Sequence, residues 1–548
     1  MSEKDLSGKN LDSRREEESL FWADQIAKKV VERKKFHYLD KEIKKPDVFT
    51  VKTSASLSGV LHIGRLSDTI RGDSVFRALK DLGVNAKLIW VAEDMDPLRK
   101  VPKGVPKEYY DYIGMPVTDV PDPFGCHDSY AEHFASEYMS VIDKFVHSEM
   151  EKYSMRAEYK KGSFRPYIKK IMENIDKVRE ILNKYRDNKL GPDWSPWKPV
   201  CKKCGKIATT RVIEVKDGKV HYVCEDYNFK STTAKGCGYE GWADPLVDDG
   251  KLMWKSEWAA QWARWGVVSE GAGKEYQVPT SAFWVNAEIV EKILDYPMPE
   301  PIFYEHLMID GVKMSASLGN VVYPKDWLEV APPELLRFYY NKRLMKTRSF
   351  SWKDLPLLYD EFDNAASVYF GMLKLDNEKE EKHIKRLYEI SALRIEKPLS
   401  MRFSHAVVIA QLFDDKEKII ESLKKTGHYE EEFENRIFER INYAKNWVKK
   451  YAPENYRFEL QLEPKVKLSD EEKLIVKDVI EALKSKSLDE KELHRKFYEI
   501  AESHNIKTKD FFKLMYGILL NKDRGPRLAH FLISLGDTAL EILNKVVE

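Results

Sequence analysis

Two short stretches of the chain hold residue types that suit the handling of phosphate groups. The first, Leu57–Leu66 (LSGVLHIGRL), connects a β-rich run to a helical pattern. A strand that ends at a helix N-terminus aims backbone N–H groups and the helix dipole at an anion. His62 could donate a hydrogen bond to a phosphoryl oxygen as charge grows in a transition state. We interpret the turn as an ATP site, with a histidine-capped buried turn as the alternative for this motif alone. The candidate ATP-binding residues here are Gly59, His62, Ile63, Gly64 and Arg65.

The second stretch is Lys313–Ser317 (KMSAS), which lies far downstream between two glycines. Lys313 supplies a point charge for the β- and γ-phosphates, and serine hydroxyls can bind phosphate oxygens. A polar surface loop would explain this motif alone. The two motifs together, in this order, predict adenylate-forming chemistry with His62 and Lys313 as catalytic residues. The ATP-binding set gains Lys313, Met314, Ser315 and Ser317.

The elements around the first motif predict the start of a parallel sheet. Residues 48–53 (VFTVKT) are β-rich, apolar residues from 66 to 82 recur at helical spacing, and residues 86–92 (AKLIWVA) favour a buried strand. Such a β–helix–β unit is typical of a Rossmann-like α/β domain, where ligands bind beyond the carboxyl ends of the strands. From about residue 352 the patterns are almost only helical, which predicts an all-α C-terminal bundle.

Composition limits the class of protein. A chain of 548 residues exceeds one hydrophobic core, so we expect roughly three domains. The balance of 91 basic and 90 acidic residues neither demands nor excludes a nucleic-acid partner. No apolar run approaches the roughly 20 residues of a membrane span, and the charged N-terminus lacks the apolar core of a signal peptide. We expect no membrane association.

Four of the five cysteines fall within residues 201–237, which predicts a metal site rather than disulfides and therefore a cytoplasmic protein. Cys201 and Cys204 form a CxxC pair, and Cys224 and Cys237 complete four sulfurs for a closed structural zinc site. Buried free thiols are the alternative. Twelve residues separate the last two cysteines, so a loop must close the site.

A second cluster, in DPFGCHDSYAEHF, offers Asp122, Cys126, His127 and His133 as ligands of a metal. The two histidines are six residues apart and do not share a helix face. Both could reach one metal only if His127 precedes the helix. Ordinary polar residues are the alternative.

The motifs HIGR and KMSAS resemble those of class I aminoacyl-tRNA synthetases. More closely, the chain resembles the class I lysyl-tRNA synthetase family in FWADQIA, VAEDMDPLRKVP, PDPFGCHDSYAEHF and KDRGPRLAHFL, which are spread over nearly the whole chain. The resemblance implies that the protein activates lysine with ATP and Mg²⁺ and transfers it to the 3′ end of tRNA(Lys). It also implies zinc, one ion or two, with a metal at the Asp122 cluster.

The resemblance implies a domain order. We expect a charged extension over 1–18, a Rossmann-like catalytic domain over 19–310 with a zinc-binding insertion over 98–244, a loop and stem-contact region over 311–360, and an anticodon-binding bundle over 361–548. Flipped anticodon bases would stack on aromatic or arginine side chains, although core packing is the alternative for each aromatic residue. The candidates are Phe511, Phe512, Tyr516, Arg524 and Arg527.

An amino-acid pocket for lysine needs an anion for the ammonium and aromatic walls for the methylenes. The carboxylates near the motifs are Glu93, Asp94, Asp96 and Glu257. Core packing is the alternative for each tryptophan of the aromatic stretch that includes Trp254. The predicted amino-acid-binding residues are Ser54, Ser56, Asp96, Trp254 and Tyr276.

One stretch departs from the family pattern. The chain has Gly273-Lys274-Glu275-Tyr276 where the family typically has Gly-Lys-Asp-His. Glu275 can still accept a hydrogen bond from a ribose hydroxyl, whereas Tyr276 is bulkier than imidazole and does not titrate near neutrality. A tRNA-binding paralogue that no longer charges tRNA therefore stays open as an alternative. So do a nucleotidyltransferase that shares only the His-Ile-Gly turn and, as a lesser option, glutamyl specificity, which would require an arginine for the substrate side chain.

Overall fold

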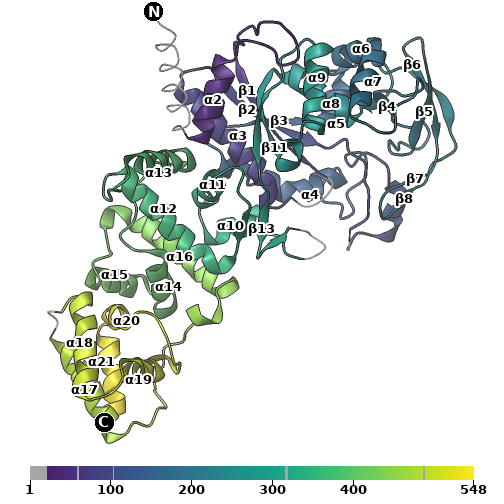
Figure 1. The fold of residues 1–548 in the computed structure, drawn as a ribbon. Coiled ribbons are helices and arrows are strands. Elements are labelled where there is room, and N and C mark those ends of the chain that lie inside the picture. The colour runs from purple at the N-terminus through teal and green to yellow at the C-terminus, as the bar shows by residue number, and fades with distance from the viewer. Residues whose placement is uncertain (1–20, 58–60, 103, 315–318, 486–487) are drawn as a thin grey trace, which may run out of the picture. The chain divides into compact units, whose positions relative to one another are not determined.

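The computed structural model describes residues 21–57, 61–102, 104–314, 319–485 and 488–548 (Figure 1). The chain divides into two compact units. The first contains residues up to 326, 336–350 and 375–395, and the second contains 327–335, 351–374 and 396–548. The predicted extension over residues 1–18 lies outside the described residues, and the other predicted domain bounds stay predictions.

A five-stranded sheet organises the first unit. Its order is β12-β11-β1-β2-β3, and every neighbouring pair is parallel. The chain leaves β1 in one direction to build β2 and β3, and later returns to the other side of β1 to build β11 and β12. This reversal places a crevice at the carboxyl ends of β1 and β11. The strands are β1 (Phe49–Ser56), β2 (Ala86–Glu93), β3 (Glu151–Ser154), β11 (Val267–Gly273) and β12 (Glu300–Tyr304).

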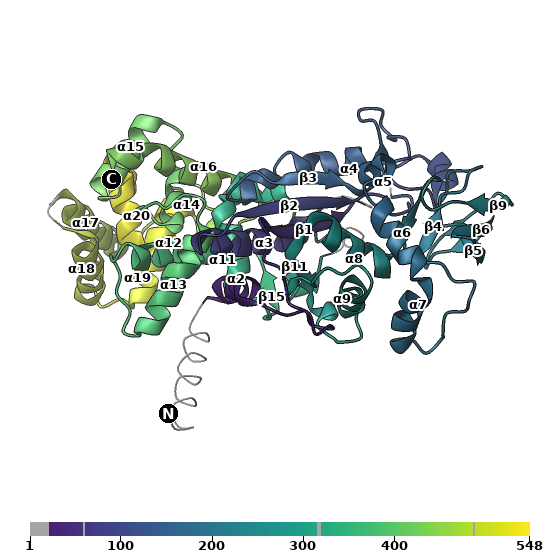
Figure 2. The ribbon, with the colours of Figure 1, turned by 90° about the horizontal axis from the view of Figure 1, so that it is seen from above.

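The structure confirms the predicted Rossmann-like α/β fold. Helix α3 (Ile63–Asp81) connects β1 to β2, and Gly83 follows it with a φ of 74° that suits a glycine. Helix α8 (Trp254–Trp265) is the predicted aromatic helix, and Gly266 ends it in the left-handed conformation. Figure 2 shows α8 together with α9 (Ala282–Lys292) beside β11. Helix α2 (Trp22–Glu32) packs on α3.

Residues between β2 and β11 form more than one substructure. Strand β3 lies inside the predicted insertion but pairs with β2 in the main sheet. Helices α4 (Tyr130–Met139), α5 (Met155–Lys161), α6 (Arg165–Glu173) and α7 (Ile175–Lys184) lie in the same interval. Three small antiparallel sheets follow. They are β4 (Trp197–Pro199) with β10 (Gly250–Leu252), β5 (Thr210–Lys216) with β6 (Lys219–Cys224) and β9 (Glu240–Ala243), and β7 (Tyr227–Asn228) with β8 (Thr233–Ala234).

The segment with the lysine-methionine-serine motif begins with a hairpin of β13 (Leu307–Ile309) and β14 (Val312–Lys313), and β15 (Arg348–Phe350) pairs with β13. Helix α13 (Glu378–Ser391) also belongs to the first unit. Arg337 joins α13 to α3, because its fully buried guanidinium donates to Asp73 at 2.6 Å and to the carbonyl oxygens of Ser391 and Ile390. Helices α10 (Pro324–Val330) and α11 (Pro333–Asn341) each contain a boundary between the units.

The second unit is helical, as predicted. Two of its helices begin with a capping box, in which Ser469 pairs with Glu472 and Asp489 pairs with Glu492. None of the described helices is long and apolar enough to cross a membrane. The helices wholly in this unit are α12 (Leu355–Tyr369), α14 (Phe403–Leu412), α15 (Lys416–Lys425), α16 (Glu434–Lys450), α17 (Asp470–Lys484), α18 (Glu490–Ser503), α19 (Thr508–Leu520), α20 (Leu528–Leu535) and α21 (Asp537–Val547).

Candidate active site at the carboxyl ends of the sheet

A cavity of about 650 Å³ opens in the first unit where β1, β2 and β11 end. This is the switch point at which sheets of this topology bind ligands. Most of the predicted ATP- and amino-acid-binding residues line it. They are Ser54, Ser56, His62, Gly64, Arg65, Asp96, Trp254, Glu275, Tyr276, Lys313 and Met314.

His62 stands at the N-cap of α3, and its Nδ1 accepts a hydrogen bond from the Gly64 N–H at 3.1 Å. Burial, together with the nearby Arg65 guanidinium, lowers the pKa of His62 to about 4. The imidazole is therefore neutral near pH 7. Because Nδ1 is the acceptor, the proton is on Nε2, which is free to act as a donor to a ligand in the cavity.

The backbone at the start of α3 differs from the expectation. The Ile63 N–H donates to the Val322 carbonyl at 2.8 Å, the Gly64 N–H to His62, and the Arg65 N–H to the His62 carbonyl at 2.9 Å. The first three N–H groups thus already have acceptors, which corrects the expectation that they are aimed at a phosphate. The helix dipole, the His62 imidazole and the Arg65 side chain remain as the favourable groups for an anion at this end.

The two phosphate-handling motifs meet at Gly64. A Cβ atom built on Gly64 would lie 2.8 Å from Met314 Cε and 2.8 Å from the His62 ring. The glycine is needed here because a methionine of the distant motif packs against it. Lys313 reaches the same cavity from a tight hairpin whose turn residues, Asp310 and Gly311, have φ values of 49° and 79°.

Among the predicted ATP-binding residues that the structure describes, one does not line the cavity. The Ile63 side chain is fully buried in the core and does not line the cavity. Gly59, Ser315 and Ser317 lie outside the described residues, so their roles stay predictions.

Aromatic side chains form one wall at the amino-acid end. Trp254 is 41% exposed and stacks on Trp258 with ring centroids 4.9 Å apart, and Tyr276 contacts Trp258 edge-on at 5.4 Å. The other tryptophans of α8, Trp262 and Trp265, are buried in the core. Core packing, the alternative weighed for each tryptophan, therefore holds for two residues of this helix, while Trp254 faces the cavity.

Acidic side chains form another part of the wall. Of the four carboxylates considered from the sequence, Glu93, Asp96 and Glu257 line the cavity. Asp94 does not, because it turns into the protein and accepts the backbone N–H of Arg156 at 2.8 Å. Burial raises the pKa of Glu93 and of Glu257. A ligand ammonium would lower the pKa of both carboxyl groups, because it favours their ionised forms.

Sequence reasoning missed several charged residues that build this end. Lys52 is fully buried in β1 and pairs with Glu270 at 2.6 Å, while the indole N–H groups of Trp258 and Trp262 donate to the other Glu270 oxygen. Asp68 accepts the Ser54 N–H at 3.0 Å, and burial raises its pKa to about 6. In the sequence, the one sign of this ion pair is that Lys52 and Glu270 stand within apolar runs that otherwise predict buried strands.

At the departure from the family pattern, a histidine from another element stands beside Glu275. His306 Nε2 lies 3.1 Å from a Glu275 carboxylate oxygen, and both residues line the cavity. A Cβ atom on Gly273 would lie 2.5 Å from a Glu275 carboxylate oxygen, so the carboxylate packs against the glycine in space that a side chain would fill. The site thus retains a carboxylate next to an imidazole, although position 276 is a tyrosine.

The four clustered cysteines converge as predicted. Their sulfurs all lie within 4.8 Å of one another, with 3.6 Å between Cys201 and Cys237 and 3.6 Å between Cys204 and Cys224. Four sulfurs at about 2.3 Å from a tetrahedral zinc ion lie about 3.8 Å apart, so this set could hold zinc.

The twelve residues between Cys224 and Cys237 fold back on themselves. They contain the β7–β8 hairpin, and Asp226 holds its base by accepting the Gly236 N–H at 3.0 Å. A Cβ on Gly236 would lie 2.4 Å from the Glu225 backbone, so the two ends of the insertion are in close contact there. The insertion therefore leaves both cysteines in reach of the other pair.

The second cluster also converges. Asp122, Cys126, His127 and His133 each place a ligand atom within 4.8 Å of the others. Helix α4 begins at Tyr130, so His127 precedes it, as the expectation required. Asp122 accepts backbone N–H groups from Cys126 and His127 at 2.7 and 2.8 Å, which holds the loop around the cluster. These four residues could hold a metal ion.

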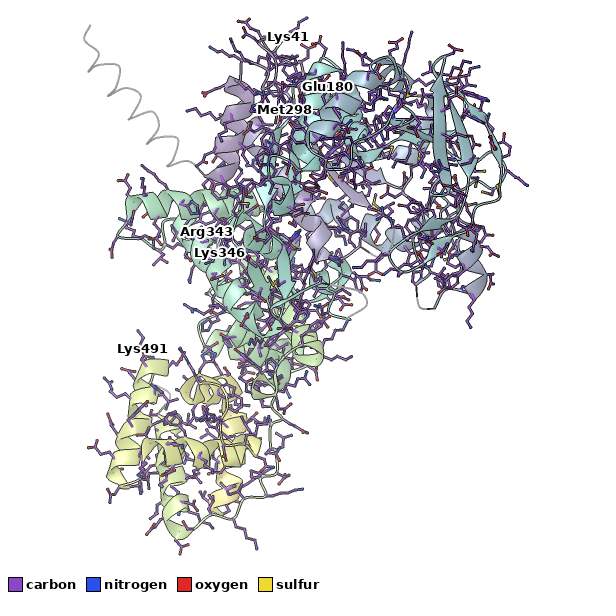
Figure 3. All side chains as sticks on the ribbon, turned by 45° about the vertical axis from the view of Figure 1, so that its right-hand side comes forward. Lys41, Glu180, Met298, Arg343, Lys346 and Lys491 are labelled. Atoms are coloured by element: carbon purple, nitrogen blue, oxygen red, sulfur yellow. The ribbon has the colours of Figure 1, made fainter. Side chains whose placement is uncertain are left out.

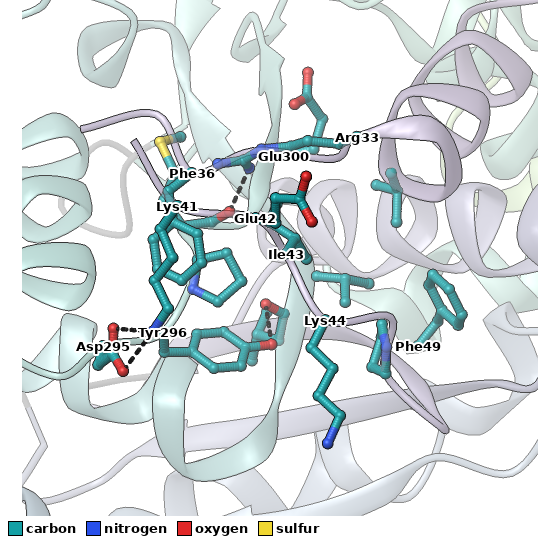
Figure 4. A pocket seen from close by; sticks show the side chains of 16 residues that line it. Arg33, Phe36, Lys41, Glu42, Ile43, Lys44, Phe49, Asp295, Tyr296 and Glu300 are labelled. Carbon is teal, nitrogen blue, oxygen red and sulfur yellow. Dashed lines mark hydrogen bonds and ion pairs between the residues drawn. The ribbon is translucent and has the colours of Figure 1, made fainter. Parts of the chain in front are cut away.

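A second cavity, of about 300 Å³, lies at the opposite ends of the strands. Figure 4 shows Phe49 and Glu300, the first residues of β1 and β12, in its wall, and the ion pair between Lys41 and Asp295 at its rim. Lys41 and Met298, labelled in Figure 3, both line it. It contains none of the predicted site residues.

Comparison with known proteins gives the family. The family model of class I tRNA synthetases (K) matches residues 20–394. A lysine–tRNA ligase of Pyrococcus furiosus is 36% identical over 534 residues, which cover 94% of this chain and 97% of that one. One of Methanosphaera stadtmanae is 31% identical over 537 residues, with 94% and 97% coverage. A solved glutamate tRNA ligase from Elizabethkingia meningosepticum covers 91% of this chain and 99% of that chain at 12% identity with a TM-score of 0.38, a likeness too distant to support an inference. The chain belongs to the class I lysyl-tRNA synthetase family.

Proposed function

We propose that the protein is a lysine–tRNA ligase, which activates lysine with ATP and transfers it to the 3′ end of tRNA(Lys). The observation that carries the proposal is one cavity in which the two phosphate-handling motifs meet at one end and an acidic, aromatic-walled pocket lies at the other. Membership of the family and the names of its curated relatives support the choice of lysine.

In the first step, a lysine carboxylate oxygen attacks the α-phosphorus of ATP. A new P–O bond forms, the bond to the bridging oxygen of the β-phosphate breaks, and pyrophosphate leaves with the electron pair. In the second step, a hydroxyl of the 3′-terminal ribose attacks the carbonyl carbon of the adenylate. The bond from that carbon to the phosphate oxygen breaks, and AMP leaves with the electron pair while the hydroxyl proton is released. No covalent bond to the protein is needed, so the protein contributes positioning and charge stabilisation.

At the phosphate end, His62 donates from Nε2 to a phosphoryl oxygen while its unprotonated Nδ1 accepts the Gly64 N–H. Lys313 and Arg65 supply positive charge near the phosphates, and Mg²⁺ would supply more when bound with ATP. Glu275, steadied by His306, accepts hydrogen bonds from the ribose hydroxyls. The ATP-binding set proposed from the sequence further includes Gly59, Gly64, Met314, Ser315 and Ser317, whereas Ile63 is buried and its N–H donates to Val322.

At the other end, Trp254 and Tyr276 cover the methylenes of lysine, and the acidic wall that includes Asp96 attracts its ammonium. Ser56 donates to Asp96 at 3.3 Å and so orients that carboxylate. Ser54 completes the amino-acid set. A glutamate side chain would meet the same acidic wall and be repelled, which argues against glutamyl specificity.

The other parts of the chain would serve tRNA and stability. Zinc at Cys201, Cys204, Cys224 and Cys237 would fix the small sheets together. A second ion at Asp122, Cys126, His127 and His133 would fix the turn before α4. The helical unit would bind the anticodon through exposed groups such as Arg524 and Arg527, because Phe511 and Tyr516 are buried in its core. We place the protein in the cytoplasm, where tRNA is charged.

The test is ATP–pyrophosphate exchange with each amino acid in turn, followed by charging of tRNA. Lysine should support exchange far better than any other amino acid, and tRNA(Lys) should be charged. Exchange with no amino acid, with tRNA binding retained, would instead establish a tRNA-binding paralogue. Absence of tRNA binding would favour a nucleotidyltransferase.

Elemental analysis of the purified protein tests the metal sites, since two zinc ions per chain are expected if both clusters are occupied.

A further inference from the structure

One lysine of the protein itself occupies the acidic end of the cavity. Lys251 lies in β10, and its side chain is only 13% exposed. Its ammonium is 3.0 Å from a Glu257 oxygen and 3.4 Å from an Asp96 oxygen. The protein thus places the same chemical group as the lysine side chain among the carboxylates that would attract it.

The surroundings of this ammonium are strongly polar. From α5, Tyr159 donates its hydroxyl to the second Glu257 oxygen at 2.7 Å. From the loop after β2, the Arg99 guanidinium lies 3.9 Å from Asp96. Glu93 stands at the end of β2, where Gln261 of α8 donates to it at 3.0 Å. The Lys52–Glu270 pair lies beside Glu93, with 3.9 Å between Lys52 and Glu93.

The balance of charged groups around Lys251 indicates its role. Lys52 and Glu270 neutralise one another. That leaves Glu93, Asp96 and Glu257, together with the buried Asp94, which also interacts with Lys251, around one buried ammonium and the more exposed Arg99. A buried carboxylate without a cation takes up a proton instead of staying ionised. The number of carboxylates that stay ionised, and hence the pull on a ligand ammonium, therefore depends on Lys251.

We propose that Lys251 is a specificity-determining residue for lysine activation: it is a fixed counter-ion that keeps Glu257 ionised and pairs with Asp96, so that the acidic end has charge left for one ligand ammonium beside Glu93. The proposal rests on the proposed function and adds to it a residue that acts through the carboxylates. It explains why a pocket for a cation contains a cation. Without it, the buried Glu257 carboxyl group would have no cation beside it and would take up a proton.

The experiment measures kcat/KM for lysine in ATP–pyrophosphate exchange as a function of pH. Lys251→Met keeps most of the side-chain volume and removes the charge, and Lys251→Gln also keeps a hydrogen-bond donor. Both variants should lose about tenfold or more in kcat/KM near neutral pH, as expected for a shift of about one pKa unit in the carboxyl groups. The loss should shrink as pH rises, because the carboxyl groups then ionise without help. Lys255→Met, at a lysine outside the described lining, is the matched control and should follow the unaltered protein.

Chemical rescue separates charge from packing. Lys251→Ala leaves a space that methylammonium can enter, so added methylammonium should restore part of its kcat/KM, whereas it should not help Lys251→Met, in which the space is filled. Thermal unfolding of each variant shows that the protein is folded under assay conditions.

A loss that is equal at every pH and unaffected by methylammonium would overturn the proposal, because Lys251 would then serve packing alone. An unchanged pH profile in Lys251→Met and Lys251→Gln would overturn it as well. Failure of the proposed function looks different, because the unaltered protein would then show no exchange with lysine at any pH.

Discussion

The two ends of the cavity are built in different ways. The phosphate end comes from two short, contiguous motifs whose members touch directly, as Met314 does at Gly64. The amino-acid end comes from single residues on β1, β2, β10, α8 and β11, which are joined by buried ion pairs. A contiguous motif can be recognised in a sequence because its spacing is short and regular. A network of isolated buried charges has no spacing to recognise, and it exists only once the strands are side by side.

Removing a buried charge from the amino-acid end should have the largest effect and tests the difference between the two ends most directly. Lys52→Met leaves Glu270, which is 1% exposed, without its cation. We expect the free energy of unfolding to fall by about 3–5 kcal/mol, because an uncompensated charge stays in the core. Denaturant unfolding measures the change. The double variant Lys52→Met/Glu270→Gln should recover much of the loss, and equal losses in the single and double variants would contradict the ion-pair account.

At the phosphate end, one side chain should matter for catalysis and little for folding. His62→Asn keeps an N-cap acceptor for α3 but removes the Nε2–H donor. We expect kcat for pyrophosphate exchange to fall by about 10²–10³, as for the loss of one donor to developing charge. Stability should change little. A variant with full kcat would show that His62 only caps the helix.

A substitution that crowds the contact between the two motifs should have a smaller effect on stability. Gly64→Ala puts a methyl group 2.8 Å from Met314 Cε. We expect a cost of about 1–3 kcal/mol, as for other overpacked sites, with KM for ATP affected more than KM for lysine. Combining it with Met314→Ala should relieve the clash and restore most of the stability. A double variant as unstable as Gly64→Ala would show that the His62 ring, and not Met314, is the obstacle.

The His62 and Glu93 side chains should also differ in their response to pH. Burial lowers the pKa of His62 to about 4, so this imidazole stays neutral down to about pH 5. Burial raises the pKa of Glu93 to about 8, and a ligand ammonium favours its ionised form. Lysine binding at neutral pH should therefore release a proton. Calorimetry in two buffers of different ionisation enthalpy measures it. The release should disappear well above pH 8, where Glu93 is already ionised. Release that persists there would assign the proton to another group.

How much the sequence predicted follows the same division. The parallel-sheet fold, the helix after the His-Ile-Gly turn and the aromatic helix were predicted because apolar periodicity reports local structure. The four cysteines were found because metal ligands are few and chemically distinct, whereas the Asp122 cluster became a metal candidate only through the family resemblance. Strand β3 was missed as part of the main sheet, because a short strand, EKYS, with half-exposed residues has no clear pattern.

The sequence by itself determined the family, and it predicted the residues of the phosphate end and the candidate metal ligands, since these depend on residue types in short motifs. The tertiary structure decided which groups are free to act. It showed that the first N–H groups of α3 are already used, that Asp94 faces away while Asp96 and Glu257 face the cavity, and that Lys251 lies among the acids. These facts depend on burial and on contacts between segments far apart in the chain, because the free energy of a charge depends on what surrounds it in space.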